Sequence, residues 1–202
     1  MTDPVLQNTP LHSSRLVHYS DERFELDRSR TYTQRSPETY GKPNGFWVSV
    51  QGDNDWESWC RDENFYVESL DVSQTVTLVP GASVLFIKNA SELAEFNARF
   101  ATNPYRDVSI PGLRDVSYLA IDWRKVAESF GGVVIAPYQA AARFKLSWYY
   151  GWDCASGCIW DLSVIESLSE ELSPAQLTEV SRFGIHDMDI EADRFERRGG
   201  VS

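Results

Sequence analysis

The stretch that decides the fold is Lys42–Cys60, KPNGFWVSVQGDNDWESWC, which holds three of the chain's seven tryptophans. Residues 45–50 predict a strand in which Trp47 and Ser49 share one face, and Gly45 allows a ligand or another backbone to approach closely. Residues 51–55 predict a turn, with Asn54 or Asp55 capping a helix over 56–63. Two interpretations follow: the indoles fill a core, or Trp47, Ser49 and Trp59 form a slot for a flat ring.

The rest of the chain predicts an α+β domain with more strand than helix. Strands are expected over 14–20, 131–138 and 158–165, and three β-rich runs follow one another over 64–72, 74–79 and 82–89. Helices are expected over 91–100, from Asp122 onward and over 173–183. We expect one domain over 1–184, with a loose lead-in at 1–13 and a charged tail at 185–202.

Composition narrows the class of function. A formal net charge of −11 argues against a general nucleic-acid groove, which needs a basic stripe. A local basic patch remains open at Arg23, Arg28, Arg30 and Arg35, although pairing of these residues with neighbouring carboxylates is the preferred interpretation. Three cysteines make no disulfide framework and predict a cytoplasmic protein. Scattered histidines predict no metal, and no apolar run is long enough to span a membrane.

A third informative stretch is Trp148–Asp161, WYYGWDCASGCIWD, a tight aromatic loop that enters a strand. Burial among aromatic rings would perturb the pKa of Asp153, which suits catalysis, although a structural carboxylate bonded to loop backbone is equally common. A Cys–His nucleophilic pair, Cys154 or Cys158 with His18, is a weaker alternative. His18 itself, in the apolar run LVHYS, fits a core residue as well as a ligand contact.

Taken in order, these segments resemble the ADP-ribosyltransferase superfamily, in the branch similar to poly(ADP-ribose) polymerases whose NAD site begins with His. His18-Tyr19-Ser20 stands where the family has a His-Gly-Ser/Thr-like triplet. Residues 45–49 match a Gly-φ-aromatic-φ-Ser/Ala strand, and residues 57–60 stand near the helical aromatic that stacks on nicotinamide. Trp160-Asp161 matches the aromatic-Asp pair that ends the last family strand. The combination is also similar to a family of bacterial and phage proteins.

The resemblance implies two small packed antiparallel sheets with short flanking helices and NAD bound in the crevice between them. His18 would hydrogen-bond the adenine-side ribose, and the backbone beside it, at Tyr19 and Ser20, would fix the nicotinamide amide with help from Ser49. Trp59, together with Trp47, would stack on the nicotinamide, and Gly45 belongs to the same NAD-binding set. Ser156 occupies the place of the family's catalytic Glu, so Asp153 is the candidate carboxylate. Relatives similar to RNA 2′-phosphotransferases use the same fold without that Glu. The implied activity is transfer of ADP-ribose to a macromolecular acceptor, protein or nucleic acid.

Two other classes of function stay open. A non-catalytic module would hold a nucleotide or peptide in the aromatic crevice without turnover, and the departure at Ser156 favours it. A structural or partner-binding protein would use all the aromatic residues as core.

Overall fold

The computed structural model describes residues 15–37, 41–52, 54–105 and 119–170. All of these except Glu170 belong to one compact unit that ends at Ser169. The helix predicted over 173–183, the lead-in, the tail and the predicted domain end at 184 lie outside the described residues.

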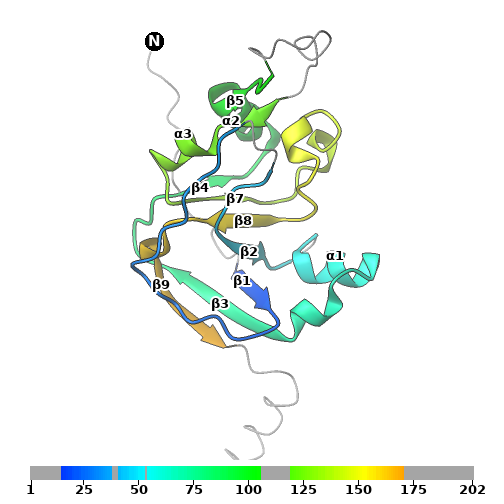
Figure 1. The fold of residues 1–202 in the computed structure, drawn as a ribbon. Coiled ribbons are helices and arrows are strands. Elements are labelled where there is room, and N and C mark those ends of the chain that lie inside the picture. The colour runs from blue at the N-terminus through cyan, green and yellow to red at the C-terminus, as the bar shows by residue number, and fades with distance from the viewer. Residues whose placement is uncertain (1–14, 38–40, 53, 106–118, 171–202) are drawn as a thin grey trace, which may run out of the picture. The chain divides into compact units, whose positions relative to one another are not determined.

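One seven-stranded sheet dominates the described residues, in the order β4-β7-β8-β2-β1-β3-β9 (Figure 1). Its strands are listed here in chain order: β1 Leu16–Ser20, β2 Phe46–Val50, β3 Val72–Leu78, β4 Val84–Ile87, β7 Gly132–Ile135, β8 Ser156–Ile159 and β9 Ile165–Glu170. A second ladder pairs β5 Ala101–Thr102 with β6 Ala120–Ile121.

The predicted α+β class is confirmed, but the predicted pair of small antiparallel sheets is corrected. The strands form one continuous curled sheet. β2 pairs with both β1 and β8 and therefore joins the strands that were expected to form two separate sheets. The β4–β7 pair is parallel, with Val84 opposite Gly132. A parallel pair needs a crossover connection, and α2 lies within the one used here.

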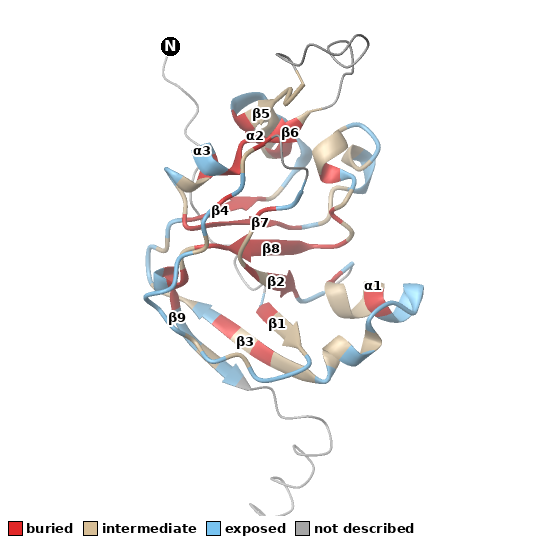
Figure 2. Ribbon diagram, in the orientation of Figure 1, coloured by how far each residue is buried: buried red, intermediate tan, exposed pale blue. Residues whose placement is uncertain are grey.

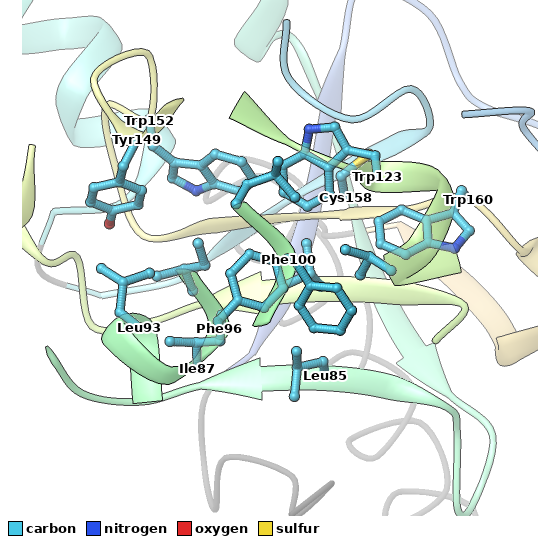
Figure 3. Close-up of a cluster of buried hydrophobic side chains, with 14 residues drawn as sticks. Leu85, Ile87, Leu93, Phe96, Phe100, Trp123, Tyr149, Trp152, Cys158 and Trp160 are labelled. Carbon is cyan, nitrogen blue, oxygen red and sulfur yellow. The ribbon is translucent and has the colours of Figure 1, made fainter. Parts of the chain in front are cut away.

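The alternation of side chains along β4 and β7 divides the core into two clusters on opposite faces of the sheet. Leu85, Ile87 and Val133 join a cluster rich in aromatic residues, which also takes up Phe96 and Trp152 (Figure 3). The second cluster contains their strand neighbours and one face of β1, β2 and β3, as follows: Leu16, Phe46, Val48, Val50, Val76, Val84, Phe86 and Val134. Buried residues therefore run along β7 and β8 in Figure 2.

Among the described residues, three α-helices accompany the sheet: α1 Trp56–Glu63, α2 Ala90–Phe100 and α3 Trp123–Ala127. Asp55 caps α1, as predicted, by accepting a hydrogen bond from the Ser58 amide. Asn89 caps α2 by accepting a hydrogen bond from the Glu92 amide. The same part of the chain has 3-10 helices at Val67–Leu70, Ala140–Ala142, Ser147–Tyr149 and Leu162–Val164.

Two strand predictions were wrong. The run 64–72 makes a turn and a 3-10 helix before β3, because Asn64 and Tyr66 adopt positive φ angles of 49° and 50°. The run 158–165 is interrupted after Ile159, where Asp161 accepts from the Ser163 amide and caps a 3-10 turn. Hydrogen bonding by a short acidic side chain to nearby backbone competes with strand pairing in this way.

Candidate functional site

A pocket of about 290 Å³ opens where β1, β2, β8 and the N-terminus of α1 meet. Its walls are lined by Val17, Tyr19, Lys42, Trp47, Val48, Ser49, Trp56, Asp153, Cys154 and Ser156. The lining is mostly apolar, with a few polar groups that converge on it. That composition is typical of a small-molecule site.

Strand pairing brings the predicted residues to this pocket from distant parts of the sequence. Ser49 on β2 lies opposite Val17 on β1 and opposite Ser156 on β8. Because side chains alternate along a strand, Tyr19 and Trp47 emerge on the same face two positions away. Five of the predicted site residues therefore line one cavity: Tyr19, Trp47, Ser49, Asp153 and Ser156.

Ser49 connects the pocket wall to α1. Its hydroxyl oxygen accepts a hydrogen bond of 2.9 Å from the Trp56 amide, while Asp55 accepts from both the amide and the hydroxyl of Ser58. These bonds satisfy donors at the first turn of the helix, which have no partner within the helix. A serine hydroxyl that accepts a hydrogen bond can also donate one, which suits a ligand in the pocket.

Asp153 lies on the rim of the pocket between two cations. Its Oδ1 accepts from Arg143 Nη2 at 2.9 Å, and its Oδ2 is 3.7 Å from Lys42 Nζ. The same cations also contact aromatic faces, Lys42 over Trp47 at 5.3 Å and Arg143 over Tyr150 at 5.4 Å. The carboxylate is therefore held in place, and part of its charge is balanced.

Trp59 lines a second, more open hollow of about 420 Å³ that shares Asp153 with the first. Its indole stacks on that of Trp56 with ring centroids 5.1 Å apart. Trp56, one helical turn earlier, is the indole of α1 that lines the first pocket. The two tryptophans share a face of α1, as expected for residues three apart, and Trp56 is the one that lies next to the strands of the first pocket.

His18 points to the side of β1 opposite Val17 and Tyr19. Its ring stacks on Phe46 at 4.1 Å, and its Nδ1 lies 2.7 Å from the Trp47 carbonyl oxygen. Since a carbonyl oxygen only accepts, Nδ1 carries the hydrogen. Burial lowers the pKa of His18, and the hydrogen bond to Trp47 offsets part of that effect.

Ser20 and Gly45 also lie away from the pocket lining. Ser20 donates its hydroxyl to the Glu22 carbonyl at the end of β1. At Gly45 a Cβ would meet the Ile159 carbonyl oxygen at 2.5 Å. The partner that approaches Gly45 is therefore the backbone of β8.

The cysteines lack the features of a nucleophile. Cys154 lines the pocket, but burial raises the pKa of its thiol to about 11. Burial likewise raises the pKa of Cys158, which lies in the aromatic cluster. A reactive cysteine needs a thiolate near neutral pH, so these environments favour the neutral thiol.

Sequence reasoning missed three residues of the site: Lys42, Trp56 and Arg143. Two of them could have been predicted from the sequence. Lys42 begins the stretch 42–60, and Trp56 is three residues before Trp59 and therefore on the same face of the helix. Arg143 lies in an irregular segment with no pattern, and only folding brings it to Asp153. The four arginines of the proposed basic patch are all exposed, and one of them, Arg30, packs over Tyr32.

Compared with known protein families, curated proteins and solved structures, the chain matches none of them. Within the described residues, no group of three or more His, Cys, Asp or Glu side chains is arranged to hold a metal ion. None of the helices in that same part of the chain has the length and apolar character needed to cross a membrane.

Proposed function

We propose that the protein is an NAD-dependent ADP-ribosyltransferase that modifies a macromolecular acceptor. One observation carries the proposal: three of the four segments that resemble the family lie on or beside the adjacent strands β1, β2 and β8 and contribute residues to one pocket, while Trp59 of the fourth lines the neighbouring hollow. Tyr19, Trp47 and Ser156 represent the three segments there. Their separation in the sequence makes this meeting a consequence of the fold and supports a common ligand.

In the proposed complex, the nicotinamide ring lies between the apolar walls and stacks on Trp47 or Trp56. Offset stacking on an indole suits a flat heterocycle, and the Ser49 hydroxyl is a suitable donor to its amide oxygen. The Tyr19 hydroxyl donates to Glu57 at 3.1 Å and so fixes the tyrosine ring at the pocket edge. Binding of this kind positions the glycosidic bond near Asp153.

The reaction breaks the bond between the ribose anomeric carbon and the nicotinamide nitrogen. Nicotinamide leaves with the bonding electrons, the acceptor's nucleophilic atom bonds to the anomeric carbon, and the acceptor loses its proton. The ribose carries positive charge in the transition state, and the carboxylate of Asp153 stabilises it electrostatically. In this proposal Asp153 replaces the catalytic Glu of the family, because Ser156 at the Glu position is neutral.

A second candidate is a nucleotide-binding module without turnover. The ion pairs of Asp153 favour it, because a carboxylate already balanced by Lys42 and Arg143 stabilises a nearby cation less well. This alternative retains the pocket and the stacking but predicts no release of nicotinamide.

The test is nicotinamide release from NAD by the full chain, compared with Asp153→Asn. We expect the variant to lose about 10²–10³-fold in rate, as for removal of one electrostatic group in a transition state. Asp122→Asn is the matched control, because Asp122 also lies near two cations, Arg124 at 3.5 Å and Lys125 at 3.7 Å, outside the pocket lining. NAD binding without release by the wild type would establish the binding module, and no binding would refute both candidates.

A further inference from the structure

Lys42 and Arg143 place two cations within 4 Å of one carboxylate at the rim of the pocket. The local charge of this group of three is positive, whereas the whole chain carries −11. Asp153 thus compensates for one of the two cations only. Asp122 with Arg124 and Lys125 has the same charge balance, but only the group at Asp153 lies at the pocket.

We infer that Lys42 and Arg143 bind the diphosphate of the ligand, an inference that rests on the proposed function. Lys42 is suited to it because its side chain is 43% exposed and lines the pocket, and its Nζ lies over the ring of Trp47. In NAD one ribose separates the nicotinamide from the diphosphate, so a ligand whose ring stacks beside Trp47 brings its diphosphate within one sugar of the ring, toward the Lys42 ammonium. Lysine acts as a compact point charge toward phosphate, with three donors that can rotate.

Arg143 supplies the second contact from the opposite side of Asp153. Its Nη2 donates to Asp153, while its buried Nε has no hydrogen-bond partner among the described residues. The side chain as a whole is 31% exposed. A guanidinium has five donors in a planar fork, and its remaining donors suit the oxygens of a diphosphate.

The effect of removing the Asp153 carboxylate on anion affinity differs in direction between the two possible roles of Lys42 and Arg143. If the three residues only fasten two loops together, removing the carboxylate loosens the rim and weakens any ligand. If the cations bind phosphate, removing the Asp153 carboxylate leaves both cations uncompensated and strengthens the binding of an anion. The single variant Asp153→Asn therefore separates the two roles, and it does so without any measurement of catalysis.

The experiment measures binding of ADP-ribose and of nicotinamide by calorimetry to the full chain, in low and in physiological salt. We expect Lys42→Met and Arg143→Met each to weaken ADP-ribose by roughly ten- to a hundred-fold, as for loss of a hydrogen bond to a charged group. Arg143→Lys, which retains charge and loses the fork, should fall between them and the wild type. Asp153→Asn should bind ADP-ribose more tightly, and nicotinamide affinity should stay within about two-fold throughout.

Lys125→Met and Arg124→Met are the matched controls, because both cations contact Asp122 outside the pocket and should leave ADP-ribose affinity unchanged. Wild-type affinity in folded Lys42→Met and Arg143→Met, or weaker binding in Asp153→Asn, would overturn the inference while leaving nicotinamide release intact as support for the proposed function. Tight ADP-ribose binding that follows the expected pattern, in a protein that never releases nicotinamide, would support the diphosphate site and refute the transferase.

Discussion

Gly45 stands where β2 begins to pair with β8, and an alanine at this position tests how closely the two backbones approach. A Cβ there would lie 2.5 Å from the Ile159 carbonyl oxygen and 2.7 Å from Cys158 Sγ. The first of these atoms belongs to the backbone and cannot rotate away. Gly45→Ala therefore forces β2 or β8 to move, and forced overpacking of this kind costs about 1–3 kcal/mol.

The assay is chemical denaturation of the purified full chain, with thermal unfolding beside it. At about 2–4 °C per kcal/mol for a chain of this size, we expect the Tm to fall by roughly 2–12 °C. Gly151→Ala is the control, because its nearest neighbour is Lys42 Cε at 3.5 Å, an ordinary contact. That variant should change the free energy of unfolding by less than about 1 kcal/mol.

A double variant locates the clash. Adding Cys158→Ala to Gly45→Ala removes the sulfur at 2.7 Å but leaves the carbonyl oxygen at 2.5 Å, so the rescue should be partial. We expect a favourable coupling of about 1 kcal/mol between the two substitutions. Gly45→Ala with an unchanged free energy of unfolding would refute the close approach, and full rescue by Cys158→Ala would assign the clash to the sulfur alone.

Three further predictions follow from the site. Burial lowers the pKa of His18, so the unfolded chain binds its proton more readily; the free energy of unfolding should fall as the pH drops below about 6.5. Denaturation at pH 7.5 and pH 5 should show a smaller fall in His18→Gln, and equal falls would contradict this reasoning. Asp55→Ala should cost about 1–2 kcal/mol by removing the cap of α1, and NAD should bind less tightly because Trp56 moves with the helix; unchanged stability would show that the cap is dispensable. Quenching of tryptophan fluorescence by NAD should shrink in Trp56→Phe more than in Trp59→Phe, since Trp56 lines the pocket and Trp59 lines the neighbouring hollow, and the reverse order would move the ligand to that hollow.

Features set by neighbouring residues were predictable from the sequence. The alternation of β2 places Trp47 and Ser49 on one face because successive side chains point to opposite sides of a strand, and both line the pocket. Asp55 caps α1 because a short carboxylate can reach the amide three residues ahead. Where local rules compete, prediction failed: residues 64–72 have strand-like composition, but Asn64 and Tyr66 turn the backbone to positive φ.

Only the tertiary structure decided which residues meet. Strand pairing turned His18 toward Phe46 and Tyr19 toward the pocket, although the two are neighbours in the sequence. The rotation of α1 about its axis depends on its packing and on the bond from Trp56 to Ser49, and that rotation brought Trp56 to the first pocket. The contacts of Lys42 and Arg143 with Asp153 were not predictable from spacing, because contacts between separate segments form only when the chain folds and leave no periodic pattern in the sequence.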